Sequence, residues 1–203
     1  EATRLGPNYA KARFGLGWSY FQLGKYGKAI LPLKIAVKAE PNMAASHFTL
    51  GKVLAALDNH SQAIEEFKKT LVISPIFPDA YFQLGRSYVS LKMFNDGVLA
   101  YNDTLRLSPN FFEAYIGIGK AYINADRNAE AIAPLRNAIT INPRSTDAYD
   151  KLGIAYANLG QHERAIAPYL ELARIDFRNP VAHYKAGVAY SKINKKQEAI
   201  KSF

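Results

Sequence analysis

The chain has 203 residues, of which 49% are hydrophobic and 21% charged, so it can bury a sizeable core and is not disordered by composition. It has no run of about 18 apolar residues that would span a bilayer, and it has no cysteine, which excludes disulfides, thiolate metal sites and a cysteine nucleophile. The net charge of +9 raises nucleic acids or acidic membranes as partners, so the distribution of that charge has to be considered.

A pattern of 34 residues repeats along the chain without an insertion or deletion. A tyrosine or leucine follows the central glycine of each copy by three residues, a small residue follows it by twelve, and a proline closes four copies. A fixed period of this length indicates a repeat architecture. The central glycines are Gly17, Gly51, Gly85, Gly119, Gly153 and Gly187.

Each copy has the pattern of two amphipathic helices. Around Gly85, apolar residues recur at helical spacing before the glycine and again from Val98 onward. The closing proline, such as Pro109, ends the second helix because the residue before a proline disfavours helical backbone. In chain order, we expect the end of a preceding repeat over residues 1–9, five complete repeats over 10–43, 44–77, 78–111, 112–145 and 146–179, and a truncated sixth over 180–203.

Local departures from the pattern give further expectations. Three prolines inside second helices should bend those helices or delay their start: Pro32, Pro134 and Pro168. Gly97 replaces an alanine and should leave a gap that loosens the third helix pair. Phe177 stands in place of a closing proline, so the helix before it should run longer, and Pro180 should begin the next helix.

The pattern resembles the tetratricopeptide repeat over essentially the whole chain. In the third copy, the family's large aromatic, Leu, Gly, Tyr, Ala, Phe and Pro correspond to Tyr81, Leu84, Gly85, Tyr88, Gly97, Tyr101 and Pro109. The resemblance implies an all-α fold, a right-handed α-α superhelix (solenoid) of helix pairs. Because both ends of the sequence cut through a repeat, we expect a segment of a longer array.

Nothing in the sequence indicates catalysis. The four histidines fall in two repeat positions several repeats apart, His47 with His183 and His60 with His162, so they cannot converge on one metal ion. The glycines do not complete a phosphate-binding loop, and no serine has the surroundings of a nucleophile elbow. The sequence therefore predicts a protein that is not an enzyme and needs no metal or other cofactor.

The positive charge is concentrated at the two ends. Residues 1–43 carry seven basic and two acidic groups, residues 44–179 carry fourteen of each, and residues 180–203 carry five basic and one acidic. Nucleic-acid binding favours a continuous basic stripe, so this distribution disfavours a nucleic-acid partner. The absence of cysteine fits both cytoplasm and periplasm, and we favour the cytoplasm.

The resemblance also implies a site, since in this family the first helices line a concave groove that holds an extended or helical segment of a partner. One row of this face, three residues before each glycine, begins with aromatic side chains and continues to Ile116, and a second row, one residue after each glycine, begins with Trp18 and continues with cations. These rows lie side by side on a helix. The predicted partner-binding residues are Phe14, Trp18, Phe21, Phe48, Lys52, Phe82, Arg86, Lys120, Asn124 and Asn158.

We therefore expect a non-catalytic protein–protein interaction scaffold that binds a peptide or protein segment in this groove. The alternatives are the substrate-recruiting or assembly arm of a larger enzyme or secretion machine, and a scaffold that self-associates through open terminal repeats. The Lys and Asn pattern with which chaperone-adaptor members hold a C-terminal carboxylate is absent, because Phe14 and Trp18 occupy its first two positions.

Overall fold

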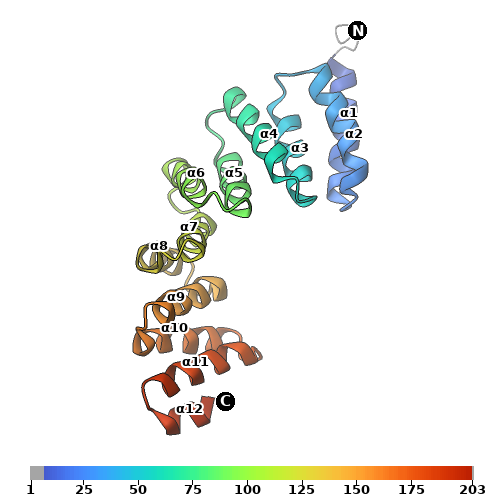
Figure 1. The fold of residues 1–203 in the computed structure, drawn as a ribbon. Coiled ribbons are helices and arrows are strands. Elements are labelled where there is room, and N and C mark those ends of the chain that lie inside the picture. Colours follow the sequence, from blue (N-terminus) through green and yellow to red (C-terminus); the bar gives the residue numbers. More distant parts are fainter. Residues whose placement is uncertain (1–6, 203) are drawn as a thin grey trace. The chain divides into compact units, whose positions relative to one another are not determined.

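The structure is a computed structural model that describes residues 7–202, and within that range it contains twelve α-helices and no β-strand (Figure 1). Consecutive helices pack against each other as antiparallel pairs, α1 with α2, α3 with α4 and so on to α12. The predicted all-α solenoid of helix pairs is confirmed. The helices are α1 (Pro7–Gln22), α2 (Tyr26–Ala39), α3 (Ala44–Ala56), α4 (His60–Ile73), α5 (Pro78–Ser90), α6 (Phe94–Leu107), α7 (Phe112–Asn124), α8 (Asn128–Ile141), α9 (Thr146–Asn158), α10 (His162–Ile175), α11 (Pro180–Lys192) and α12 (Lys196–Ser202).

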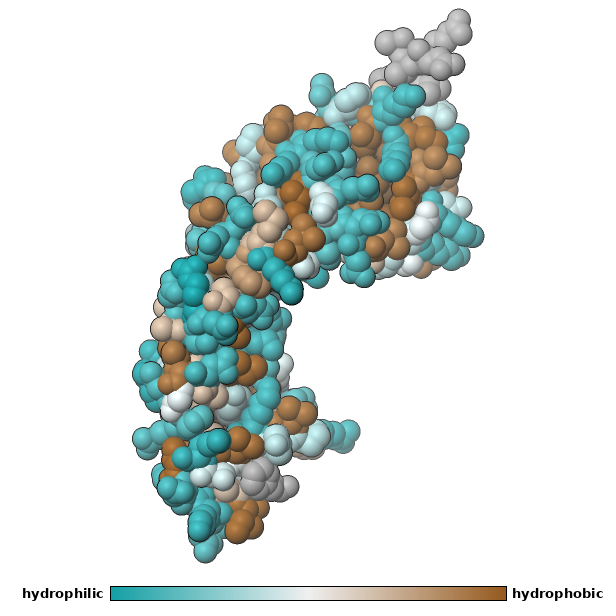
Figure 2. Space-filling view, viewed as in Figure 1, coloured by the Kyte–Doolittle hydropathy of each residue, from teal (hydrophilic) through white to brown (hydrophobic). Residues whose placement is uncertain are grey.

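The chain divides into two compact units, residues 1–108 and residues 109–203. In the first unit, Leu33, Val53 and Phe67 are fully buried in one apolar core. In the second, the core includes Leu135 and Leu152. On the visible face of both units, apolar residues lie in bands between hydrophilic ones (Figure 2).

The repeated glycines permit close packing of the two helices in a pair. A Cβ atom at Gly51 would lie 2.6 Å from a carbon of the Phe67 ring, and one at Gly119 would lie 2.5 Å from Leu135 Cγ. Real Cβ atoms do not approach other carbons this closely, so an alanine at either position would push the second helix away. The glycine at these positions therefore allows the two helices of a pair to approach closely.

A left-handed residue ends each first helix. The position seven residues after the central glycine has φ between 57° and 70° in all six copies, although only two of those residues are glycine. In the second copy, the N–H of Asn59 donates to the carbonyl oxygen of Leu54 at 2.9 Å, as expected when a left-handed residue reverses the chain after a helix. The six residues are Gly24, Asp58, Lys92, Asp126, Gly160 and Asn194.

The internal prolines do not delay the second helices. Five second helices, α2, α4, α6, α8 and α10, begin nine residues after their glycine and have fourteen residues each, whether or not they contain proline. Pro32, Pro134 and Pro168 lie well inside α2, α8 and α10. A proline there costs one backbone hydrogen bond. The helix nevertheless begins at the same repeat position as the second helices without proline. The expected delay is wrong.

The junction around Phe177 follows the other junctions. Helix α10 ends at Ile175, and the N–H of Asp176 donates to the carbonyl oxygen of Leu172 at 2.9 Å, as Ser108 does to Thr104 at 2.8 Å. The expectation of a longer helix is wrong, because this hydrogen bond closes α10 without a proline. The prediction that Pro180 begins the next helix is confirmed, and the Asn179 side chain accepts from the N–H groups of Val181 and Ala182.

Gly97 leaves no gap. A Cβ atom at this position would lie 2.6 Å from Val89 Cγ2 and 3.2 Å from the carbonyl oxygen of Gly85. The β-branched Val89 fills the space that a missing methyl group was expected to open, so the prediction of a loosened pair is wrong. Residues 1–6, assigned above to a preceding repeat, lie outside the described residues, and residues 7–9 begin α1 instead of ending an earlier helix.

Candidate functional site

The first helices of the first unit bring three aromatic rings around one ammonium group. Lys52 Nζ on α3 lies 4.6 Å from the ring centroid of Phe21, 5.4 Å from that of Phe48 and 5.9 Å from that of Trp18. Each of these distances is within the range of a cation–π attraction. Phe21 and Trp18 come from α1, so Lys52 links two consecutive repeats.

Two of the rings around Lys52, those of Trp18 and Phe21, form an aromatic row on α1 together with Phe14. The centroids of Trp18 and Phe21 are 5.6 Å apart, and those of Phe14 and Trp18 are 6.4 Å apart. Trp18 keeps 37% of its surface exposed, and Phe14 and Phe21 are half-buried. A partner therefore has access to one side of this row.

The aromatic residues on α3 and α5, Phe48 and Phe82, also pack against other rings of the first unit. The Phe48 ring lies 4.6 Å from that of Phe77 and 5.9 Å from that of Phe67, and the Phe82 ring lies 5.6 Å from that of Tyr101. The rings of Phe48 and Phe82 are thus half-buried against second-helix side chains. The same side chains support the fold and form the surface.

The surroundings of Lys52 disfavour its charge. Burial lowers the pKa of the Lys52 ammonium below its ordinary value, because the rings displace water, and the carboxylate of Asp79 offsets part of this effect. The ammonium group is therefore partly dehydrated. Such a group gains more than a fully hydrated one from an added carboxylate.

A hollow of about 230 Å³ lies beside Lys52 within the first unit. Arg86 stands on the α5 side of it and donates from Nη1 to Gln83 Oε1 at 3.3 Å. Burial raises the pKa of Tyr101 to about 12, and the positive charge of Arg86 opposes that rise. The hollow is lined by Phe21, Tyr26, Lys52, Ala55, Ala56, His60, Gln83, Arg86, Ser87 and Ser90.

The second unit places its share of the predicted site residues differently. Ile116 is only 6% exposed and packs with Ala138 and Ala148, so it is a core residue and not part of a surface row. Lys120 Nζ lies 2.7 Å from Asp147 Oδ2, and Asn158 donates to Asn128 Oδ1 at 3.0 Å. Asn124 is exposed at the end of α7.

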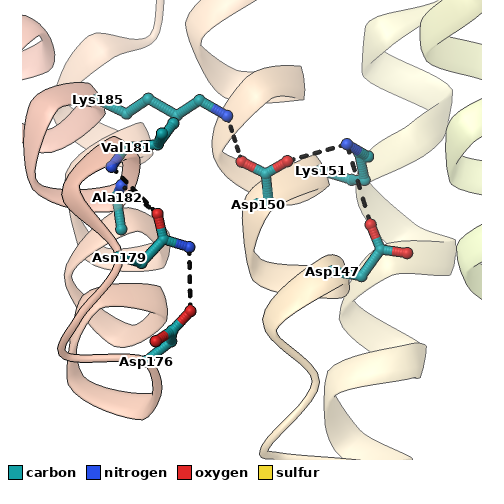
Figure 3. A network of polar contacts seen from close by, with 8 residues as sticks. All are labelled: Asp147, Asp150, Lys151, Asp176, Asn179, Val181, Ala182 and Lys185. Atoms are coloured by element: carbon teal, nitrogen blue, oxygen red, sulfur yellow. Dashed lines mark hydrogen bonds and ion pairs between the residues drawn. The ribbon is translucent and has the colours of Figure 1, made fainter.

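Ion pairs connect the first helices of the second unit. Asp150 on α9 accepts from Lys185 on α11 and, at 2.9 Å, from Lys151 (Figure 3). Lys151 Nζ is also 3.9 Å from Asp147, which pairs with Lys120 on α7. Burial disfavours the charge of Asp150, but hydrogen bonds from Lys185 and Lys151 outweigh this effect and lower the pKa of its carboxyl.

Sequence reasoning missed this network as a structural feature. Asp150 occupies the repeat position of Phe14, Phe48 and Phe82, and Lys151 and Lys185 occupy the next one. The sequence did contain a signal for this network. An aspartate replaces the aromatic residue at one repeat position, and the next position is lysine in that repeat and in the following one. Opposite charges on neighbouring repeats at these positions are close enough to pair.

A second polar cluster is buried in the first unit. His47 is 4% exposed, with Nδ1 2.5 Å from Glu66 Oε2 and Nε2 2.9 Å from the carbonyl oxygen of Pro41. Burial disfavours the charge of Glu66, but hydrogen bonds from His47 and Lys69 outweigh it and lower the pKa of the carboxyl. His47 therefore has a structural role, tying α3 to α4 and to the preceding turn.

The described part of the chain contains no group of three or more histidine, cysteine, aspartate or glutamate side chains arranged to hold a metal ion. Among residues 7–202, no helix combines the length and apolar character needed to cross a membrane.

Family models for the tetratricopeptide repeat match more than half of the chain. One matches residues 1–41 and 82–146, and another matches residues 135–167. No curated protein sequence matches the chain.

Several solved structures share the fold. The crystal structure of MamA is 24% identical with a TM-score of 0.77, over 83% of this chain and 92% of that one. YrrB, described as a TPR protein with an unusual peptide-binding site, is 20% identical with a TM-score of 0.70, over 84% and 88%. PilF of Pseudomonas aeruginosa is 18% identical with a TM-score of 0.78, over 97% and 90%. At these identities the similarity shows the fold alone.

Proposed function

Because the chain belongs to the tetratricopeptide repeat family, whose fold supports protein–protein interaction, we propose that its first unit binds a partner segment on the face of α1, α3 and α5. An apolar side chain of the segment packs on the row of Phe14, Trp18 and Phe21. A carboxylate of the same segment lies between Lys52 and Arg86. The role is that of a scaffold and not of an enzyme, as is typical of this family.

The observation that carries the proposal is the position of Lys52. Its ammonium group is held against three rings at the edge of a hollow that Arg86 also lines. Hydrogen bonds between a charged donor and a carboxylate are stronger than neutral ones, and they gain further where water is excluded. Aromatic and arginine side chains are also the residues that most often dominate interface energetics.

The second unit is left out of the proposed site. Lys120 already pairs with Asp147, and Asn158 is hydrogen-bonded to Asn128. A ligand carboxylate at Lys120 would have to displace Asp147, which offsets most of the gain. The peptide-binding site described for YrrB supports a peptide as the kind of partner, although that similarity concerns the fold.

Two pools of fluorescein-labelled dodecapeptides test the proposal by fluorescence anisotropy. One pool has a central Leu or Phe flanked by Glu, and in the other Lys replaces every Glu. We expect the acidic pool to bind more tightly. Trp18→Ala should weaken that binding by about 2 kcal/mol, and Lys52→Met should remove the preference for the acidic pool.

Lys68→Met is the matched control. Lys68 Nζ also lies over a ring, 5.7 Å from the centroid of Tyr88, but it is on the second helix α4 and does not line the hollow. Its replacement should leave binding unchanged. Equal affinity for the two pools, or an equal effect of Lys52→Met and Lys68→Met, would contradict the proposal.

A further inference from the structure

A second hollow, of about 540 Å³, lies in the second unit between the second helices α8 and α10, with the first helix α9 as its floor. The two walls come from Arg136, Ile139 and Thr140 on α8 and from Arg164, Ala167, Pro168 and Glu171 on α10. The floor residues are Tyr149, Leu152 and Tyr156. The volume is in the range of cavities that bind ligands.

One residue that faces the hollow from α10, Ala167, has a small side chain. Ala167 lies fourteen residues after its central glycine, and the same repeat position in the first unit holds Leu31, Glu65 and Leu99. Leu31 and Leu99 are 67% and 63% exposed, so a large side chain is compatible with the helix at this position. A leucine at position 167 would therefore narrow the hollow without disturbing the helix.

Two arginines make the rim of the hollow positive. Arg164 is exposed, its guanidinium carbon lies 4.7 Å from the ring centroid of Tyr156, and its Nη1 donates to Gln161 Oε1 at 2.9 Å. Arg136 is exposed on the opposite wall. The one acidic residue of the lining, Glu171, accepts from Arg174 Nε at 2.8 Å, which offsets its charge.

The floor of the hollow is apolar and aromatic. Leu152 and Tyr156 are buried, at 6% and 3% exposure, Tyr149 is half-buried, and the half-buried Ile139 continues the apolar surface onto the α8 wall. The Arg164 guanidinium stacks on the Tyr156 ring, which holds it in place. Its remaining N–H groups are then available to a ligand. This combination fits an apolar group with carboxylates next to it.

We propose that this hollow is a docking site for an acidic segment of a partner protein. The segment inserts one apolar side chain between α8 and α10, and its carboxylates pair with Arg136 and Arg164. A nucleic acid fits less well, because residues 44–179 carry fourteen basic and fourteen acidic groups and so offer no continuous positive track for a phosphate backbone. The inference is independent of the site proposed on α1, α3 and α5.

Phage display of random dodecapeptides on the immobilised 203-residue chain tests the proposal. The bound phage are counter-selected on the Arg136→Gln/Arg164→Gln variant, so that peptides bound at the first unit are removed. We expect the surviving sequences to contain Asp or Glu on both sides of a Leu, Phe or Tyr. A surviving pool without acidic enrichment, or no surviving pool, would overturn the proposal.

Calorimetry with the selected peptides then distinguishes the contribution of the two arginine charges from that of the open hollow. Arg136→Gln/Arg164→Gln should weaken binding at least tenfold, and so should Ala167→Leu, which leaves both charges in place and fills the hollow. Circular dichroism melts confirm that each variant is folded.

Two variants serve as matched controls. Arg127 is stacked 4.6 Å from the Tyr122 centroid but is paired with Glu130, and Ala133 is the α8 equivalent of Ala167 outside this hollow. Arg127→Gln and Ala133→Leu should leave affinity within twofold of the original. The docking site is disproved if Ala167→Leu binds as tightly as Ala133→Leu.

Discussion

Lys52 in the first unit and Lys120 in the second occupy the same repeat position but have different surroundings. Lys120 Nζ pairs with Asp147 at 2.7 Å, whereas Lys52 lies over three rings, and Asp79, the counterpart of Asp147, acts on it only as a nearby charge. The residue one turn earlier is Phe48 in the first unit and Ile116 in the second. Lys52 therefore lies among aromatic neighbours at the surface of a hollow, while Lys120 is paired with a carboxylate of the next repeat.

The comparison shows how one repeated scaffold supports two kinds of face. In the first unit the first helices present rings and cations, and in the second they present alternating lysines and aspartates that neutralise one another. A face whose charges are already paired contributes to the stability of its own unit. A face with a partly dehydrated cation favours the addition of an anion from outside.

The largest effect should distinguish Ile116 from Phe14, which share one repeat position. Ile116→Ala should lower the free energy of unfolding by about 3 kcal/mol because the side chain is buried. Phe14→Ala should lower it by about 1 kcal/mol because its ring is half-buried. Urea denaturation measures both, and equal losses would mean that this position has the same role in both units.

The ion-pair network of the second unit should be sensitive to pH. Asp150→Asn should cost about 2 kcal/mol at pH 7, since it weakens two charged hydrogen bonds. The folded pKa of Asp150 lies below the ordinary 3.8, so its contribution is fully present above that pH and disappears as the pH falls through the folded pKa.

Unfolding at several pH values checks this prediction. The difference between the original chain and Asp150→Asn should shrink as the pH is lowered from 5 toward 2. The control is Asp103→Asn, which affects an exposed pair with Arg106 in the first unit and should cost at most about 0.5 kcal/mol. A difference that stays constant with pH would show that Asp150 contributes through packing and not through its charge.

A smaller effect tests the tight contact at Gly97. Gly97→Ala should lower the free energy of unfolding by about 1 kcal/mol because the added methyl group meets Val89 and the carbonyl oxygen of Gly85. Val89→Ala should recover part of that loss in the double variant. The second unit has Ala131 at the same position, so Ala131→Gly should also be destabilising. Thermal melts measure these changes. A higher melting temperature for the single variant Gly97→Ala would contradict the predicted clash with Val89 and Gly85.

The smallest effect concerns the left-handed turn between paired helices. Lys92→Gly should raise the free energy of unfolding by about 0.5 to 1 kcal/mol, because a lysine at φ 60° is strained and a glycine is not. Asp126 has φ 57° at the same position in the second unit, and aspartate tolerates this region better. Asp126→Gly should therefore gain less, and a larger gain there would reverse the expected order.

The two helices of each repeat could be predicted from the sequence, because they depend on local periodicity. The repeated glycines, such as Gly51 and Gly119, illustrate this. A residue without a side chain at a fixed spacing already indicates that two helices pack closely there. The aromatic members of the candidate site, such as Trp18 and Phe48, were also predicted, because each lies on the predicted groove face of a first helix. The sequence did not predict that aromatic rings surround Lys52.

By itself, the sequence determined the repeat, the helix pairs and the residues that share each face, since these follow from spacing along a helix. Only the tertiary structure decided which lysine lies over rings and which meets a carboxylate, because that depends on side chains from neighbouring repeats. The same holds for the two hollows, beside Lys52 and above Leu152, and for the filled space at Gly97. Contacts of this kind depend on distances of a few ångströms between helices, and a linear pattern does not contain those distances.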